Sequence, residues 1–455
     1  MPTDNRELFE KRPVNKAVVA LVVPTVISQL ITVIYNMADT FFIGQMNDPN
    51  QVAAATLAMP PFILLTGIAN LFGIGGASLV SRSLGAGDRE KARRCAAFSI
   101  WTAMAVAFLY GMGMLVLRPM ILPAIGTDAS TYEFCYRYTF WTITIGAVPT
   151  VMSALLAHLV RAEGYSKQAS FGVAMGGVLN ILLDPLFIFA FRLQIAGAAI
   201  ATMLSNLAAM GYFLCLLYRR RQSSVISFNP KYYTLRQRIP LEILLVGFPS
   251  AMMNLMGIFS NVVLNRLVAS YSSEAVAGMG IAKKIDMLAF AIATGMSQGV
   301  LPLIGYNFAA KNYTRMRAAI KTTFLYSLGV ATVGAVFLFT CAVPVSRSFI
   351  DDAATVAYGQ HFLRILCITC PCVSVTMMVI TLFQATGSKT QPMILSLLRK
   401  GGLDVPFMFL MNALQGVNAI AWATPIGDVL SMTAAICLFL PFWRRLRGQA
   451  GSKSG

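Results

Sequence analysis

The chain has 455 residues, of which 57% are hydrophobic and only 12% are charged. The charged residues cluster between apolar runs long enough to cross a bilayer, which takes about 20 helical residues. This composition excludes a soluble globular domain and predicts a polytopic helical membrane protein. The net charge of +18 would suggest a nucleic-acid partner for a soluble protein, but the basic residues here concentrate in alternate loops, so no nucleic-acid binding is expected.

Twelve apolar runs are expected to form transmembrane helices. The first sixteen residues are polar with mixed charge, and no cleavage-site pattern follows the first run, so no cleaved signal peptide is expected. The approximate bounds of the expected spans are 17–43, 52–80, 95–117, 135–160, 169–191, 195–218, 241–265, 275–304, 319–343, 358–385, 393–413 and 417–443.

Lysine and arginine alternate between the predicted loops. The even-numbered loops and both termini are basic, for example Arg82–Arg94, Arg219–Arg238 and Lys311–Lys321, whereas each odd-numbered loop holds at most one arginine. Because basic loops stay on the cytoplasmic side of a membrane, both termini are expected to be cytoplasmic.

The chain repeats itself with a period near 224 residues. Pro24 matches Pro249, Asn36 matches Asn261, and the loop Ser83–Asp88 resembles Asn307–Asn312. The expected fold is therefore an all-α integral membrane protein with twelve transmembrane helices in two pseudo-symmetric six-helix bundles. The domains would be an N-lobe (1–218), a cytoplasmic linker (219–240) and a C-lobe with a basic tail (241–455). Six helices per repeat make this a parallel repeat, which in transporters frames an alternately opening path; a duplication kept only for packing is the alternative.

Asp39 stands near the end of the first span, in the run Tyr35–Ile43, without a basic residue nearby. An ionisable group at membrane depth is costly and indicates a functional site. The alternative is a carboxylate that caps the helix end near water.

Spans five and six carry matching polar residues. Asn180 and Asp184 are four residues apart, as are Ala198 and Thr202, so each pair shares a helix face. Asp39, Asp184 and Thr202 are expected at one level, on the order of 8–12 Å below the external surface. Such oxygen-bearing groups suit a proton or a small hard cation such as Na⁺, which Asp39, Asn180, Asp184 and Thr202 would bind. Unrelated polar residues facing different neighbours are the alternative.

Three further residues are singled out by position. Tyr35 and Asn206 lie one turn from Asp39 and Thr202, respectively, and are candidate substrate contacts, although a lone tyrosine is more often a core residue. Pro24 is a candidate hinge in the helix that bears Asp39, because proline removes a backbone donor; a static kink is the alternative.

In the second half, acids and bases occur together at membrane depth. Lys283, Lys284 and Asp286 form one group, and Arg399, Lys400 and Asp404 form another. Mutual neutralisation is the favoured interpretation for both groups. Asp428 has no base near it in the sequence and is the exception to test.

Other chemistry finds little support. The eight cysteines lie mostly in apolar runs and are expected to be free, including the pair Cys367 and Cys370. Phosphate-loop, G-x-S-x-G and H-E-x-x-H motifs are absent, and only two histidines occur. Neither an enzyme nor a cofactor is expected.

On these residues the chain resembles the multidrug and toxic compound extrusion (MATE) family over all twelve spans. The resemblance is carried by Pro24, Asn36 and Asp39, the loop Gly85–Asp88, the run Asn180–Pro185, and Ala198 with Thr202. It is closest to the branch of DNA-damage-inducible transporters and bacterial drug exporters. That branch implies an N-lobe cation site matched by Asp39, Asn180, Asp184 and Thr202, with the Ala198 carbonyl nearby, and a bend of the first helix at Pro24. The other bacterial branch uses an acid in span seven, where this chain has none between Glu242 and Glu274.

The resemblance implies secondary active efflux, in which H⁺ or Na⁺ enters while an amphipathic, often cationic drug leaves. It further implies a multi-pass monomer in the bacterial inner membrane. A lipid-linked precursor flippase of the same superfamily is the alternative; it would need a basic cavity, whereas the first half shows acids. A channel or a non-transporting scaffold is a second alternative, and a channel would show downhill flux without coupling.

Overall fold

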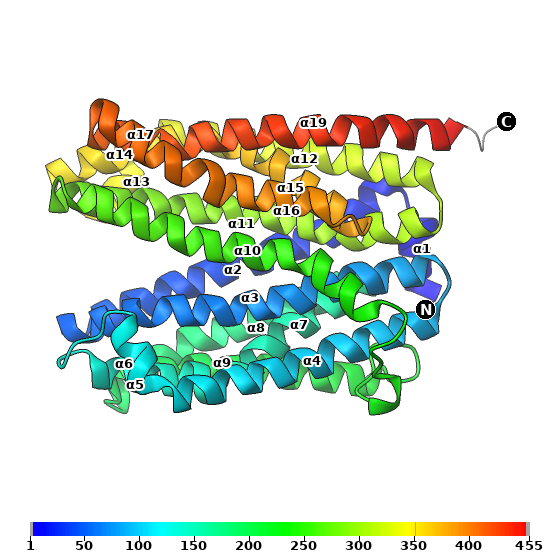
Figure 1. Ribbon diagram of the computed structural model, residues 1–455, viewed down its shortest axis with the longest axis horizontal. Helices are drawn as coiled ribbons and strands as arrows, with labels where there is room; N and C mark the ends of the chain where they lie inside the picture. The colour runs from blue at the N-terminus through cyan, green and yellow to red at the C-terminus, as the bar shows by residue number, and fades with distance from the viewer. Residues whose placement is uncertain (1–2, 351, 452–455) are drawn as a thin grey trace. The chain divides into compact units, whose positions relative to one another are not determined.

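The computed structural model describes residues 3–350 and 352–451, and every regular element in these ranges is a helix (Figure 1). The first half contains α1 (Thr3–Glu10), α2 (Val14–Gly44), α3 (Pro49–Gly85), α4 (Arg89–Val116), α5 (Arg118–Ala124), α6 (Tyr132–Thr139), the π-helix η1 (Phe140–Ile145), α7 (Ala147–Ala162), α8 (Ser166–Pro185), the π-helix η2 (Leu186–Ala190), α9 (Gln194–Arg219) and the 3-10 turn η3 (Pro230–Tyr232). The second half contains α10 (Ile239–Ala269), α11 (Ser273–Ala309), α12 (Tyr313–Thr340), α13 (Ala342–Arg347), α14 (Ala353–Cys367), α15 (Cys370–Ala385), α16 (Thr390–Leu397), the π-helix η4 (Leu398–Leu403), α17 (Asp404–Gln415), α18 (Val417–Ile420) and α19 (Ala423–Gly451).

The described helices account for the expected spans and confirm the all-α membrane fold. Nine of them are long and apolar enough to cross a bilayer, and two further spans are bent pairs, α6–η1 with α7 at 50° and α14 with α15 at 45°. The expected span 393–413 corresponds to α16, η4 and α17. Its three charged residues, Arg399, Lys400 and Asp404, explain why apolarity alone does not mark it as a span.

The two halves repeat the same order of elements. Helices α2 and α10 have 31 residues each, α3 and α11 have 37, and α4 and α12 have 28. The caps repeat as well: the side chain of Asp88 accepts from the Lys91 N–H at the start of α4, and that of Asn312 accepts from the Arg315 N–H at the start of α12. Aspartate and asparagine are equivalent N-caps, so the same local signal starts both helices.

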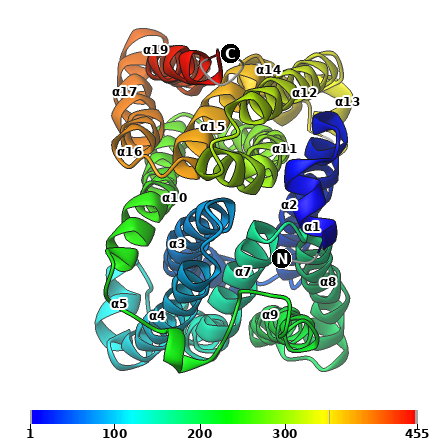
Figure 2. The same cartoon turned by 90° about the vertical axis from the view of Figure 1, so that its right-hand side faces the viewer.

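The chain divides into two compact units. Unit 1 comprises residues 1–11 and 30–251, and unit 2 comprises residues 12–29 and 252–455. The end-on view shows α3, α4, α7, α8 and α9 bundled in unit 1, and α11, α12, α15, α16 and α19 bundled in unit 2 (Figure 2). These bounds are drawn by contacts and differ from the expected lobes 1–218 and 241–455, because α2 and α10 each contribute to both units. The division into lobes by chain order stays a prediction.

Close backbone contacts at glycines explain which part of α10 and α2 joins which unit. In unit 1, a Cβ on Gly247 of α10 would lie 1.8 Å from the Leu71 carbonyl oxygen of α3. In unit 2, a Cβ on Gly295 of α11 would lie 2.7 Å from the Val26 Cα of α2. Only glycine allows helices to approach this closely, so the first turns of α10 pack on α3 and the first half of α2 packs on α11.

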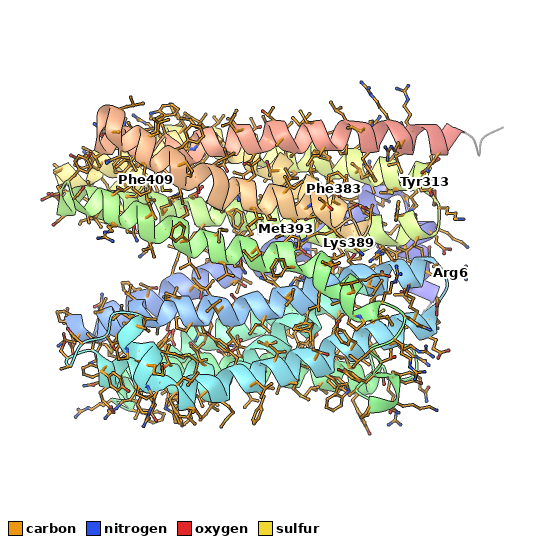
Figure 3. The ribbon with its side chains drawn as sticks, in the orientation of Figure 1. Arg6, Tyr313, Phe383, Lys389, Met393 and Phe409 are labelled. Carbon is orange, nitrogen blue, oxygen red and sulfur yellow. The ribbon has the colours of Figure 1, made fainter. Side chains whose placement is uncertain are left out.

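Each unit has its own apolar core. In unit 1 a cluster that includes Leu122, Tyr138, Ile188 and Ala198 joins α5, α6, η2 and α9. Unit 2 holds clusters around Phe362 and Phe383. In Figure 3, Tyr313 and Lys389 lie toward one end of the helices of unit 2, and Phe409 lies toward the other. The loop before α12 and the loop before α16 therefore emerge at the same end, as an even number of crossings between them requires.

Candidate ion site

Helices α2, α8 and α9 of unit 1 bring the predicted polar residues together. The Nδ2 atom of Asn180 donates to Asp184 Oδ1 at 3.3 Å and lies 3.4 Å from Thr202 Oγ1. Asp184 is fully buried, and Asn180 is 1% exposed. Asp39 lies close enough to Asp184 for their charges to interact. Four of the five predicted ion-coupling residues therefore form one cluster.

The cluster leaves three buried oxygen atoms without a hydrogen-bond donor. They are Asp39 Oδ1, Asn180 Oδ1 and Asp184 Oδ2, and none has a partner within the described parts of the chain. An unpaired buried polar atom costs about 1–3 kcal/mol, and more when it is charged. Oxygens that lack donors are ready-made ligands for a proton or a hard cation. No group of three or more His, Cys, Asp or Glu side chains suited to a metal occurs in the residues that the structure describes.

The local sequence of α8 places its two ligands. Asn180 and Asp184 share one face of the helix, and Pro185 follows directly, where α8 gives way to the π-helix η2. Proline removes a helix hydrogen bond, and single π-turns are frequent at functional sites. Gly177, one turn before Asn180, meets Ile31 and Tyr35 of α2, and a Cβ there would lie 2.9 Å from each side chain. This glycine lets α2 approach α8 at the level of the site.

The start of α9 is held by a buried glutamine. Gln51 of α3 accepts a hydrogen bond from the Ile195 N–H at 3.0 Å, and its Nε2 donates to Gln194 at 3.3 Å. The first of these bonds satisfies a backbone donor that a helix N-terminus leaves unpaired. The two bonds fix the first turns of α9, on which Ala198 and Thr202 lie. Ala198 is fully buried in the core of unit 1, and its predicted role as a carbonyl ligand stays a prediction.

Tyr138 is a member of the site that the sequence analysis did not identify. This buried residue of α6 hydrogen-bonds to the Asp39 side chain and interacts electrostatically with Asp184 and Tyr35. The π-helix η1 begins at Phe140, directly after α6. A tyrosine in an apolar run is usually a core residue. Only its depth, which matches that of Asp39, could have suggested it.

The remaining predicted residues lie around this cluster. Tyr35 is beside Asp39 in α2. Asn206 donates to the Thr202 carbonyl at 3.0 Å and accepts from Ser153 at 3.4 Å. Both are therefore next to ion-site residues, and substrate contact by either stays a prediction.

Pro24 lies inside α2, which runs without interruption from Val14 to Gly44. The Thr25 hydroxyl donates a hydrogen bond to the Leu21 carbonyl at 2.8 Å. Such a bond to the preceding turn often accompanies helix bending. Pro24 falls in the segment of α2 that belongs to unit 2, whereas Asp39 belongs to unit 1. The hinge at Pro24 stays a prediction.

The charged groups of unit 2 are arranged differently. Arg399 Nε donates to Asp428 Oδ1 at 2.8 Å, and Lys400 Nζ donates to Asp404 Oδ2 at 3.1 Å. Ser260 and Thr369 also donate to Asp404 and Asp428, respectively. The predicted neutralisation between Lys400 and Asp404 is thus confirmed. Asp428, the exception singled out for testing, is also paired, because Arg399 reaches it from a distant position in the sequence.

A helical membrane protein built from two repeated halves, with polar side chains buried at membrane depth, has the features of a membrane transporter. Comparison with known proteins agrees. The MatE family profile matches residues 24–186 and 249–410. The multidrug export protein MepA of Staphylococcus aureus (strain N315) is 32% identical over 94% of both chains. Its Staphylococcus saprophyticus counterpart is 30% identical over 94% of both chains.

A solved structure shares the fold. It is described as the outward-facing conformation of a multidrug resistance MATE family transporter of the MOP superfamily. It is similar with a TM-score of 0.91, at 24% identity, over 99% of both chains. The chain belongs to the MATE family of membrane transporters, which confirms the resemblance seen in the sequence.

Proposed function

We propose that the protein is a secondary active multidrug exporter that couples the inward movement of H⁺ or Na⁺ to the outward movement of amphipathic, often cationic drugs. The observation that carries the proposal is the set of three donor-less buried oxygens on Asp39, Asn180 and Asp184. The names of the MepA relatives, which are multidrug export proteins, support the substrate class.

The coupling would follow from charge. Two carboxylates and no base occupy the site, so Asp39 and Asp184 repel each other when both are ionised. A proton or Na⁺ removes that repulsion and supplies the missing partner for the unpaired oxygens. A conformation that closes these ligands around the ion would then be favoured over one that separates them. Ligands shift a conformational equilibrium only by such a difference in affinity.

The drug is proposed to leave when the ion arrives. Tyr35 is beside Asp39, and Asn206 bonds to Thr202. A movement of the ion ligands would therefore shift both candidate substrate contacts. A cationic drug would also lose electrostatic attraction once the two carboxyls are neutralised. Bending of α2 at Pro24, which leaves the Ala20 carbonyl without its helical donor, is proposed to accompany this step.

The proposed setting is the bacterial inner membrane with both termini in the cytoplasm. The even-numbered loops and termini carry the clustered Lys and Arg residues, as the positive-inside rule requires. Tagging the C-terminus with a reporter that is active only in the cytoplasm tests this orientation directly.

Proteoliposomes test the transport proposal. A fluorescent cationic dye is loaded, and an inward H⁺ gradient or Na⁺ gradient is imposed separately. Dye efflux with one gradient and not the other identifies the coupling ion. Efflux down the dye gradient alone, with no response to either ion gradient, would indicate a channel and overturn the proposal.

The variants Asp39→Asn and Asp184→Asn should abolish gradient-driven efflux. The matched control is Asp88→Asn, the same chemical change at the cap of α4. It should be silent, because Asn312 performs the same capping role at the start of α12. Wild-type efflux by both site variants would contradict the proposed ion site.

A further inference from the structure

A hollow of about 450 Å³ lies at the end of α9 in unit 1. It is lined by six consecutive residues, Tyr218, Arg219, Arg220, Arg221, Gln222 and Ser223. Helix α9 is one of the spans that can cross the membrane, and it ends at Arg219. Tyr218 is 70% exposed, in the position where aromatic side chains meet lipid headgroups. The hollow therefore opens at headgroup level.

The three arginines have no acidic partner. None of them forms an ion pair with any carboxylate in the described chain. Arg220 lies over the Tyr165 ring, with Cζ 4.0 Å from its centre, and Arg221 lies over the Tyr218 ring at 5.1 Å. Stacking uses the flat face of a guanidinium and leaves its N–H edge free to bind an anion.

The last lining residue of the hollow, Ser223, and the two residues after it are fixed by hydrogen bonds. Arg89 of α4 donates to the Ser223 carbonyl at 2.8 Å. Next along the chain, the Ser224 hydroxyl and the Val225 N–H both donate to the buried carboxyl of Glu163. The chain that leaves α9 is thereby tied to unit 1 where the hollow ends and directly after it (the green segment beside α4 in Figure 1). The arginines are presented from a preorganised turn rather than from a loose loop.

We infer that this hollow binds the headgroup of an anionic phospholipid such as phosphatidylglycerol. The phosphate would accept paired N–H bonds from the stacked guanidiniums, which match its geometry better than lysine does. Tyr218 would pack against the glycerol backbone at the edge of the acyl chains. A lipid is favoured over free phosphate because the hollow adjoins the end of a membrane span. This site is distinct from the ion site and independent of the coupling ion.

Native mass spectrometry of the purified full-length protein tests the site. Phosphatidylglycerol or phosphatidylcholine is added at matched concentrations, and bound lipid is counted. The triple variant R219Q/R220Q/R221Q should lose phosphatidylglycerol affinity by about fivefold for each arginine, since a basic residue near an anionic surface contributes about 1 kcal/mol. Phosphatidylcholine binding should not change. Soluble glycerol 3-phosphate should compete only weakly; equal competition would point to a free-phosphate site and overturn the lipid assignment.

The matched control removes the same charge elsewhere. R444Q/R445Q/R447Q neutralises three arginines near the end of α19, which continues as a helix to Gly451. This control should keep the tight phosphatidylglycerol binding. An equal loss in both triple variants would mean general attraction to positive charge and would overturn the site. Arg220→Lys keeps the charge but loses the planar guanidinium, which stacks on Tyr165 and offers paired N–H donors. Full binding by this variant would therefore also contradict the proposal.

Discussion

The two units differ in whether their buried acids have basic partners. In unit 1, Asp39 and Asp184 lie close enough to interact electrostatically, neither forms an ion pair with a base in the described chain, and three oxygens of the cluster lack a donor. In unit 2, Asp404 and Asp428 each hold a base at about 3 Å and a hydroxyl as well. Counted from the first residues of α8 and α16, Asn180 and Asp404 occupy the same place in the repeat, and Asp184 corresponds to the buried Met408.

This difference separates a cluster of acids with unpaired oxygens from a cluster in which each acid already has a basic partner. Removing one partner of a buried ion pair is expensive, whereas replacing both partners with apolar groups can be neutral. The pairs of unit 2 are therefore expected to stabilise the protein, and the acids of unit 1 are expected to work at the expense of stability. Substitutions in the two units should thus have opposite effects.

The largest expected effect is on transport. Asp184→Asn should lower gradient-driven efflux by about a hundredfold or more while leaving the folded protein intact, because it removes a proposed ion ligand and one of the two repelling charges. Thermal unfolding in detergent should show equal or higher stability, by up to about 1 kcal/mol. A variant that transports normally, or that fails to fold, would break the contrast between the units.

Arg399→Ala should be the most destabilising single change in the comparison. It leaves Asp428 buried with its charge unpaired, which costs about 3–5 kcal/mol. The double variant Arg399→Met/Asp428→Leu should recover most of that loss, because the uncompensated charge is gone. Unfolding temperatures measured in one detergent would decide this. If the double variant were as unstable as the single one, the pair would have a role beyond neutralisation.

Tyr138→Phe should have an intermediate effect and would sharpen the description of the ion site. It removes the hydroxyl that bonds to Asp39 and keeps the ring that packs in the core. The Tyr138 hydroxyl stabilises ionised Asp39 in competition with the driving ion, so losing this hydrogen bond, about 1.5–3 kcal/mol, should strengthen the apparent affinity for that ion by roughly ten- to a hundredfold. The ion-concentration dependence of dye efflux measures this. Tyr136→Phe, on the same helix and without a bond to Asp39, is the matched control.

The smallest expected effect concerns Glu163 at the loop after α7. Burial raises the pKa of this carboxyl above its ordinary value, although bonds from Val225 and Ser224 oppose the shift. Glu163 therefore holds its proton more tightly when the segment after α9 is bonded to it than when that segment has detached. The free energy of opening should be greatest at acidic pH and should fall as pH rises from the ordinary to the raised pKa. Hydrogen exchange at the Val225 amide, corrected for intrinsic rates, measures the opening.

Glu163→Gln should remove that pH dependence and change the opening free energy by only about 1 kcal/mol, since the amide oxygen still accepts the Val225 N–H. Protection that increases with pH in the wild type would contradict the sign. This effect lies outside both charged clusters, so it also shows what an isolated buried acid contributes without a second carboxyl beside it.

Much of the fold could be read from the residues alone. The lengths of the apolar runs define the spans, and the repeat from Pro24 and Pro249 onward predicts two similar halves. In the site, the spacing of Asn180 and Asp184 predicts a shared face, which the 3.3 Å hydrogen bond bears out. These features depend on short stretches of chain and on the thickness of a bilayer.

Other features depended on contacts between distant segments. The partner of Asp428 is Arg399, which lies on another helix. No helical spacing relates the two positions, so the sequence does not reveal that they pair. Tyr138 reaches Asp39 because α6 packs beside α2 in unit 1, and no local pattern encodes that contact. The bends at α6–α7 and α14–α15, and the sharing of α2 and α10 between units, were likewise decided by packing. Periodicity determines which way a side chain points from its own helix, whereas only tertiary structure determines what it meets there.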